Sequence, residues 1–359
     1  MHRFRTDLTN KKLPQVSVPM RERMMCLNES TLDPFQAVRE AFLQRMRGVH
    51  LNRYFSEVTA QLTEWLSQYV GVPADRLVWA NGADDLLFHT FLAVREDDRS
   101  FFAGFSPSYF DYKRYAGAVG LQARFVQLDD RFDFDLDEYL ALATHPDCKL
   151  CVLCQPNNPT GNLMDEEKIL AILRAVQVPV LVDETYFEFS GRTLLHRLDE
   201  FPHLLLVRSF SKAFSSAGLR FGYAVAQPQS IVALRKVMTF FHSSIFTQAL
   251  VLTMLEHQEL FLRHTRQVCA LRDAMYAEMA GIPGLRVWPS HTNFLLFSVG
   301  ERRPILYEHL QRHEIAVRDV SAHPLLADCL RVTVSSPRDN EAFLHQVRAF
   351  LDAERRDRT

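Results

Sequence analysis

Short apolar runs alternate with longer amphipathic segments along the chain, and this alternation predicts its main strands and helices. The apolar runs between residues 76 and 226 are five or six residues long, the length of one buried strand. Segments with apolar residues every three or four positions, as in a helix that buries one face, separate several of these runs. Strands that alternate with helices indicate a mostly parallel sheet covered on both faces. The predicted strands are residues 76–80, 101–105, 123–128, 149–154, 178–182, 204–209 and 221–226.

Helical patterns dominate on both sides of this region. Asp33 followed by Pro34 is typical of a helix start, because the aspartate caps free N–H groups and the proline fits the first turn. A second helix is predicted over residues 57–69. Residues 229–279 are almost entirely helical in pattern, with a break around Ser243, and shorter strands and helices follow them. This later part indicates a smaller α+β domain.

Length and composition support more than one domain. The chain has 359 residues, roughly twice the usual size of one domain, and 47% of them are hydrophobic, so a full packed core is available. We expect an N-terminal arm and first helix at residues 1–44, which pack with the small domain. A large domain at residues 45–250 would hold the central sheet, and residues 251–359 would form the small domain.

The charge balance and the spread of apolar residues exclude several classes of protein. The 41 basic and 43 acidic residues leave a formal charge of −2, so no basic surface argues for nucleic acid or an acidic membrane. No apolar run reaches the roughly 18 residues that cross a bilayer, and the first 30 residues contain no apolar leader segment. We therefore expect a soluble, cytoplasmic protein without nucleic-acid or membrane partners.

Three of the six cysteines have a spacing that also occurs in iron–sulfur proteins: Cys148, Cys151 and Cys154. They lie in a predicted buried strand, where successive side chains alternate between the two faces. Cys148 and Cys154 should then share one face while Cys151 points to the other, so the three thiolates cannot converge on one cluster. We interpret them as core residues and expect no metal site.

Polar residues that follow the strands carry the candidate chemistry, because open α/β sheets bind ligands at the carboxyl ends of their strands. Residues 81–85 (Asn-Gly-Ala-Asp-Asp) form a tight turn into a helix whose free N–H groups could hold a phosphate, although an ordinary turn also fits. Asn158 lies in a loop that two prolines and Gly161 restrict. Asp183 and Tyr186 follow the next strand and could reach one ligand, with a helix cap and a packed tyrosine as the alternative.

The sharpest signal follows the strand at residues 204–209. The chain has only seven lysines, and Lys212 lies within the segment Ser209-Phe210-Ser211-Lys212-Ala213-Phe214. A lysine drawn into an apolar pocket loses its charge more readily, and its amine becomes a nucleophile. Ser209, Ser211 and Arg220 could donate hydrogen bonds to a phosphate. A reactive amine, phosphate donors, a carboxylate, a phenol and an amide are together the groups that pyridoxal phosphate requires.

The order and spacing of these motifs resemble those of the class I and II aminotransferases of fold type I, and more narrowly the histidinol-phosphate aminotransferase branch. The resemblance covers most of the chain, from about residue 27 to residue 340. It implies a seven-stranded, mostly parallel central sheet covered by helices, a smaller α+β C-terminal domain, and pyridoxal 5'-phosphate as the cofactor. The motifs that carry it are Asn157-Asn158-Pro159-Thr160-Gly161, Asp183-Glu184-Thr185-Tyr186 and the lysine segment, with support from Asn52-Arg53-Tyr54, Asn81-Gly82-Ala83-Asp84-Asp85, Pro107-Ser108-Tyr109 and Leu330-Arg331-Val332-Thr333.

The resemblance also implies a role for each residue. Lys212 would hold the cofactor covalently and carry the proton during the reaction, and Asp183 would pair with the pyridine nitrogen. Tyr186 and Asn158 would contact the ring oxygen, while Tyr109 would stack on the ring. The residues implied around the phosphate are Ala83, Asp84, Ser209, Ser211 and Arg220.

Further implications concern the substrate and the assembly. Arg331, with Arg318 as a second arginine, would bind the substrate anion, because a guanidinium holds a carboxylate or phosphate bidentately. A surface ion pair is the alternative for both. Tyr54 would reach the cofactor phosphate of a neighbouring subunit, which implies a homodimer with shared active sites. The implied reaction is ping-pong transamination of histidinol phosphate or an amino acid, with glutamate and 2-oxoglutarate as the usual partner pair.

The substrate-binding wall departs from the family pattern. Members of the branch usually offer a tyrosine from the N-terminal arm, whereas residues 16–21 contain none. Residues 241–244 (Phe-His-Ser-Ser) replace a segment that usually carries tyrosine and asparagine, so His242 either contacts a different ligand or lies on the surface. Another pyridoxal-phosphate reaction, such as decarboxylation, elimination or cyclisation of an amino acid, therefore stays open as the alternative.

Overall fold

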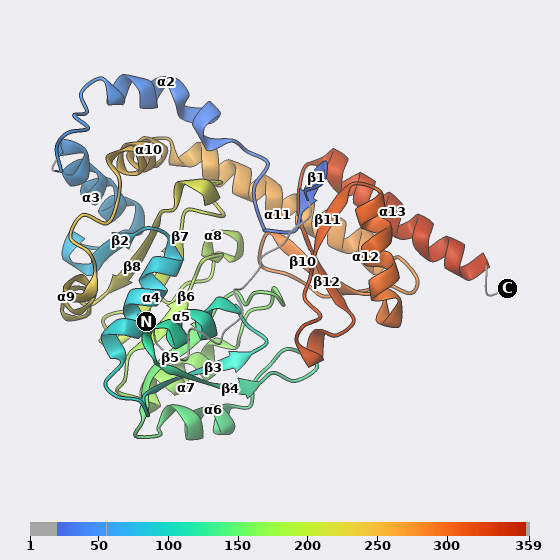
Figure 1. Ribbon diagram of the computed structural model, residues 1–359, viewed down its shortest axis with the longest axis horizontal. Helices are drawn as coiled ribbons and strands as arrows, with labels where there is room; N and C mark the ends of the chain where they lie inside the picture. Colours follow the sequence, from blue (N-terminus) through green and yellow to red (C-terminus); the bar gives the residue numbers. More distant parts are fainter. Residues whose placement is uncertain (1–19, 55, 357–359) are drawn as a thin grey trace, which may run out of the picture.

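The computed structural model describes residues 20–54 and 56–356. Within these residues the chain forms two sheets, of seven and five strands (Figure 1). The strands of the larger sheet are β2 (Leu77–Ala80), β3 (Phe101–Ser106), β4 (Gln122–Gln127), β5 (Cys148–Cys154), β6 (Val180–Asp183), β7 (Leu204–Ser209) and β8 (Gly222–Ala226). They lie in the order β2-β8-β7-β6-β5-β3-β4, and the prediction of a mostly parallel sheet is confirmed.

The direction of each strand follows from its connection. The four pairs among β3, β4, β5, β6 and β7 are parallel, and helices connect most of these strands. β8 runs antiparallel to β7, and β2 antiparallel to β8. Between β7 and β8 the chain makes only the short turn Ala217–Leu219 instead of a full helix, so it returns in the opposite direction.

Helices cover both faces of the larger sheet, and all residues of β6 and β7 are buried between them. Apolar residues at helical spacing form the buried face of each, for example Leu62 and Leu66 of α3. The helices are α2 (Pro34–Met46), α3 (Glu57–Val70), α4 (Ala83–Val94), α5 (Asp111–Val119), α6 (Leu136–Ala143), α7 (Glu166–Ala175), α8 (Phe187–Ser190), α9 (Pro228–Val237) and α10 (Ile245–Glu256). None of the helices in the described part of the chain is both long and apolar enough to cross a membrane.

The smaller sheet combines one strand from the first part of the chain with four strands from its last part. Its strands are β1 (Arg23–Met25), β9 (Arg286–Val287), β10 (Phe294–Ser298), β11 (Ile315–Asp319) and β12 (Cys329–Thr333), in the order β1-β11-β12-β10-β9. The helices α12 (Arg303–Arg312) and α13 (Pro337–Arg356) pack beside it, and the long helix α11 (Gln258–Ala280) runs between the two sheets (Figure 1). β1 pairs with β11, whereas α2 packs on α10. The domain boundaries at residues 44 and 250 stay predictions.

The predicted arrangement of the cysteine side chains is wrong for Cys148. β5 shifts its register against β3 at Lys149, and this bulge turns the thiol of Cys148 toward that of Cys151. Cys154 instead lines the cavity between the two sheets. No group of three or more histidine, cysteine or acidic side chains is placed to hold a metal ion in residues 20–54 and 56–356.

Candidate active site

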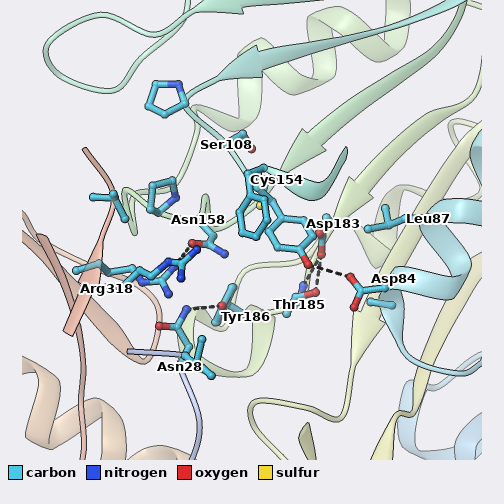
Figure 2. A pocket seen from close by; sticks show the side chains of 18 of the residues that line it. Asn28, Asp84, Leu87, Ser108, Cys154, Asn158, Asp183, Thr185, Tyr186 and Arg318 are labelled. Atoms are coloured by element: carbon cyan, nitrogen blue, oxygen red, sulfur yellow. Dashed lines mark hydrogen bonds between the residues drawn. The ribbon is translucent and has the colours of Figure 1, made fainter. Parts of the chain in front are cut away.

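A cavity of about 650 Å³ opens where the parallel strands of the larger sheet end and the smaller sheet begins. Figure 2 shows side chains from both sheets pointing into it. Because parallel strands end at the same edge, residues far apart in the sequence meet there. Of the residues singled out in the sequence, those that line this cavity are Ala83, Asp84, Tyr109, Asn158, Asp183, Tyr186, Ser209, Ser211, Lys212, Arg220, Arg318 and Arg331.

Lys212 lies in the loop after β7 with its amine at the cavity wall. Its Nζ donates a hydrogen bond of 3.0 Å to the carbonyl of Leu27, and no acidic side chain pairs with it among the described residues. Burial, together with the positive charge of Arg331, lowers the pKa of the Lys212 amine to about 8. The amine is therefore much closer to its neutral, nucleophilic form than an exposed lysine is.

Asp183 is the last residue of β6, and three hydrogen bonds hold its carboxylate. The Thr185 N–H and hydroxyl donate to Oδ1 over 3.1 and 2.6 Å, and the Tyr112 hydroxyl donates to Oδ2 over 2.7 Å. Burial raises the pKa of Asp183, and these hydrogen bonds oppose that rise. The carboxylate is thus oriented and provided with donors that favour its charged form.

The two asparagines in the loop after β5 make different contacts. Asn157 is fully buried and donates to the carbonyl of Pro107 over 3.0 Å, which fixes the loop. Asn158 reaches the cavity (Figure 2). Its Oδ1 accepts a hydrogen bond from Arg331. Since the oxygen of this amide is engaged, its Nδ2 is left as a donor toward the cavity.

Arg331 on β12 is a buried cation whose partners are all neutral. One Nη donates to Asn158, the other to the carbonyl of Cys26 over 3.0 Å, and Nε is buried without a hydrogen-bond partner among the described residues. Burial lowers its pKa to about 10. Arg318, half-buried on the neighbouring β11, also has no ion pair within the described residues. Within the described residues, neither arginine forms an ion pair.

The N-terminus of α4 faces the same cavity. Its N-cap Gly82 supplies no side-chain hydrogen bond, so the first N–H groups of the helix stay available for an anion. Arg220 lies opposite and pairs with the carboxylate of Asp84 over 2.9 Å, and the Tyr109 hydroxyl donates to the same carboxylate over 3.0 Å. Asp84 therefore positions the arginine and the tyrosine.

Two glycines allow this close approach. A Cβ on Gly82 would lie 2.6 Å from Nη2 of Arg220, and Gly82 has a φ of +92°, which side chains rarely adopt. A Cβ on Gly222 of β8 would lie 2.4 Å from the backbone nitrogen of Ala83. The small size of both residues keeps the arginine and the helix N-terminus together, as a phosphate cradle requires.

Two residues of the site were missed by the sequence analysis. Asn28 donates from Nδ2 to the Tyr186 hydroxyl over 2.8 Å, and Tyr112 donates to Asp183. Tyr112 follows Tyr109 by three residues, in the first turn of α5, and this proximity to a predicted site residue is its hint in the sequence. Asn28 stands in a polar segment before the first predicted helix, and nothing in the sequence there indicates its partner.

Tyr54 and His242 do not line the cavity. The Tyr54 side chain is 76% exposed and its ring stacks on Phe241 with centroids 4.3 Å apart. His242 is half-buried, and its Nδ1 lies 3.0 Å from the carbonyl of Thr239. Most of the atypical N-terminal arm, residues 16–19, lies outside the described residues.

The residues present fit the cofactor that the sequence predicts. Lys212 offers an amine with a lowered pKa, and the uncapped α4 N-terminus with Arg220 offers a cradle for a phosphate. Asp183 is held as a hydrogen-bond acceptor at the end of β6, which suits a protonated ring nitrogen. The unpartnered Nε of Arg331 is left over for a second anion.

Comparison with known proteins agrees with this chemistry. The family model for class I and II aminotransferases matches residues 24–347. A histidinol-phosphate aminotransferase of Nitrosococcus oceani is 34% identical over 313 residues, which cover 86% of each chain.

Solved structures confirm the predicted fold. The histidinol-phosphate aminotransferase of Sinorhizobium meliloti, in complex with pyridoxal-5'-phosphate, has a TM-score of 0.86 at 23% identity, with 98% of both chains covered. The L-threonine-O-3-phosphate decarboxylase of Porphyromonas gingivalis has a TM-score of 0.76 at 20% identity, covering 92% of this chain and 99% of that one. Both likenesses concern the fold. Since the family model matches most of its length, the chain belongs to the class I and II aminotransferases and is a pyridoxal-phosphate-dependent aminotransferase.

Proposed function

We propose that this enzyme transfers the amino group of a substrate with a terminal anion, by a ping-pong exchange with a 2-oxo acid. Histidinol phosphate is the first candidate donor and an amino acid the second, with glutamate and 2-oxoglutarate as the partner pair. The observation that carries the proposal is Arg331, a buried guanidinium on the wall of the cavity that contains Lys212, with no acidic partner in the described part of the chain. The relative from Nitrosococcus oceani supports the choice of histidinol phosphate.

The charges around the cavity favour a substrate with more than one negative charge. Asp84 pairs with Arg220, and Asp319 at the rim pairs with Arg303 over 2.6 Å. The other lysine and arginine side chains of the cavity wall have no acidic partner among the described residues; apart from Lys212, which the cofactor would occupy, they are Lys113, Arg318 and Arg331. Asp183, the third acid of the wall, would face the ring nitrogen of the cofactor. A phosphate or a second carboxylate on the substrate would balance this excess better than a single carboxylate does.

Different side chains of the cavity have different roles in the proposed reaction. When bound, pyridoxal phosphate supplies an aldehyde that accepts the amino group and a ring that withdraws electrons. We assign Lys212 as the covalent anchor and as the base that moves the proton at the substrate Cα. Asp183 would hold the ring nitrogen protonated, Tyr186 and Asn158 would donate to the ring oxygen, and Tyr109 would stack on the ring.

The same assignment separates the two anions. Arg220, the serines Ser209 and Ser211, and the N–H groups of Ala83 and Asp84 would hold the cofactor phosphate. Arg331 and Arg318 would hold the substrate anion on the side of the smaller sheet. This separation lets the cofactor stay in place while donor and acceptor exchange at the arginines.

A panel of amino donors tests the function. We expect histidinol phosphate or glutamate to convert the visible absorbance of the bound cofactor to that of its amino form, with release of the corresponding 2-oxo product. Arg331→Gln should raise KM for anionic donors by about 100-fold while cofactor retention is unchanged. The control is Arg272→Gln, which removes a buried guanidinium outside the cavity. Equal losses of substrate and cofactor binding in the Arg331 variant would refute the assignment.

The same panel tests the alternative reaction. The structural likeness to a decarboxylase on the same fold is the observation that keeps it open. Carbon dioxide, ammonia or a cyclised product, formed without the amino form of the cofactor, would favour it over transamination.

We further propose a homodimer in a cytoplasmic location. Tyr54, Phe240 and Phe241 form an aromatic cluster on the surface, in which Tyr54 is 76% and Phe240 82% exposed. Large exposed aromatic side chains that gather in this way are typical of a protein interface. A second copy of the chain would cover them and bring Tyr54 to the cofactor phosphate of its partner. The six free cysteines favour a reducing compartment.

A further inference from the structure

Asn28 forms hydrogen bonds with three separate parts of the molecule. It is 2% exposed, and its φ is +56°, a left-handed conformation that asparagine tolerates better than most residues. Its N–H donates to the Thr333 hydroxyl over 2.9 Å, and its carbonyl accepts from the Asn293 amide over 3.0 Å. Its side chain donates a hydrogen bond to the neighbouring Tyr186 hydroxyl (Figure 2). Such a network leaves the side chain almost no freedom to rotate.

The structure places the Nδ2 end of the Asn28 amide at Tyr186. The Thr333 hydroxyl accepts from the Asn28 N–H and donates its own proton to Oδ1 of Asn28, 3.3 Å away. In this arrangement the amide oxygen faces Thr333 and the Nδ2 group faces Tyr186.

The direction of this hydrogen bond decides what Tyr186 can do. Because Nδ2 is a donor, the Tyr186 oxygen must accept, and the phenolic proton has to point elsewhere. No other residue of the described chain accepts that proton in a hydrogen bond, and Tyr186 lines the cavity. Burial raises the pKa of the phenol, so it keeps its proton at neutral pH.

Thr333 links this arrangement to the substrate-binding arginine. Thr333 and Arg331 are two residues apart on β12, so their side chains lie on the same face of the strand. Arg331 contacts the carbonyl of Cys26, and Thr333 contacts Asn28, in the same N-terminal segment.

We propose that Asn28 is a positioning residue, which keeps Tyr186 a hydrogen-bond donor toward the ring oxygen of the bound cofactor and couples that donor to the strand that carries Arg331. This inference rests on the role proposed above for Tyr186. The carbonyl and amide of Asn28 need not touch the cofactor for this effect.

Exchange of Asn28 for aspartate gives the sharpest test. Asn28→Asp keeps the size, tolerates the left-handed conformation and still accepts from Thr333, but it replaces the Nδ2 donor by a carboxylate oxygen. The Tyr186 proton then turns to this new carboxylate and is lost to the cofactor. A donor to the ring oxygen stabilises its anionic form, so we expect the pH midpoint of the cofactor's visible absorbance to rise by about one unit. Cofactor Kd should rise about tenfold.

Two further variants separate this role from a structural one. Asn28→Gly suits the positive φ and removes the side chain without supplying a new acceptor, so its midpoint should rise less than that of Asn28→Asp, while cofactor Kd still rises about threefold. Asn340→Asp is the matched control, because Asn340 is a buried amide with hydrogen bonds to Ser335, outside the cavity. It should lower the melting temperature and leave the absorbance midpoint unchanged.

A double-mutant cycle with Tyr186→Phe distinguishes the possible failures. We expect Tyr186→Phe to raise the midpoint, and Asn28→Asp to add less than half of its own shift in that background. If Tyr186→Phe leaves the midpoint unchanged, the proposed role of Tyr186 fails. If Tyr186→Phe shifts the midpoint but Asn28→Asp has no effect, or the same effect in both backgrounds, the positioning role is overturned and the function stands. If Asn28→Asp does not fold and Asn28→Gly does, a wild-type absorbance midpoint together with a wild-type cofactor Kd in Asn28→Gly would overturn the positioning role.

Discussion

At the scale of single residues, Lys212 shows how its surroundings change the chemistry of a common side chain. In water a lysine amine is almost fully charged at pH 8, with about one molecule in 250 neutral. Burial and the neighbouring Arg331 lower its pKa to about 8, so that half of the amines are neutral at that pH. Burial favours the neutral amine, so at neutral pH this lysine lowers the stability of the folded chain.

This shift predicts how the cofactor attaches. An amine attacks an aldehyde only when it is neutral, so the rate of covalent attachment to the apoprotein should rise with pH through a midpoint near 8. Stopped-flow absorbance measures that rate. Arg331→Gln should move the midpoint upward because a nearby positive charge is removed, whereas Lys149→Ala, at a lysine paired with Glu96 outside the cavity, should leave it in place. A wild-type midpoint of 10 or above contradicts the prediction.

The sequence could identify the residues that stand at strand ends within motifs, and it missed those that act through them. Lys212, Asp183 and Asn158 follow apolar runs, so their common position at one edge of the sheet could be inferred from the order of residues alone. Asn28 and Tyr112 act on Tyr186 and Asp183 through contacts that form only when distant segments fold together. Neither periodicity nor local turn chemistry carries such information.

At the scale of elements, the N-terminus of α4 and the start of β8 depend on one another. Gly222 leaves room for Ala83, and Arg220, two residues before Gly222, reaches back to Asp84. The cradle is thus built by the junction of a helix with a strand that lies far away in sequence. The close approach of α4 and β8 is possible because Gly222 has no Cβ.

Gly222→Ala should separate these two elements. The added Cβ would lie 2.4 Å from the backbone nitrogen of Ala83, so α4 or β8 must move, at a cost of about 1–3 kcal/mol in unfolding free energy. We also expect a rise of at least tenfold in cofactor Kd, because the N–H groups of α4 move away from Arg220. Urea unfolding and a cofactor titration measure the two effects.

Gly218→Ala is the matched control for this variant. A Cβ at Gly218 meets nothing within 4 Å, so stability and cofactor affinity should both stay near the wild-type values. If Gly222→Ala binds the cofactor as tightly as Gly218→Ala does, the proposed cradle is incorrect.

Element positions followed the hydrophobic pattern closely where that pattern was strong. The strand predicted over residues 204–209 is the observed β7, and the helix that begins at Pro34 is the observed α2. The three-residue β1 was not predicted, since a strand so short has no period, and it exists because β11 offers a free edge. The bulge at Lys149 likewise depends on the partner strand and not on β5 itself.

At the scale of the whole molecule, the aromatic cluster at Tyr54, Phe240 and Phe241 predicts association. Phe240→Ser removes the most exposed ring of this cluster, so we expect it to shift the sedimentation profile from dimer toward monomer and to weaken cofactor binding. Ile305→Ser, at a side chain of α12 that is 54% exposed, should leave the dimer intact. Sedimentation velocity at micromolar concentration measures both variants. A monomeric wild-type protein under those conditions would falsify the homodimer.

The contact of Arg331 with Cys26 joins residues 305 positions apart in the chain, and that of Lys212 with Leu27 joins residues 185 apart. Leu27 lies between β1, which pairs with β11, and Asn28, whose N–H donates to Thr333. The carbonyl that accepts from the Lys212 amine is therefore held in place only once β11 and β12 have been synthesised. The last strands to leave the ribosome thus complete the surroundings of the lysine as well as those of the arginine.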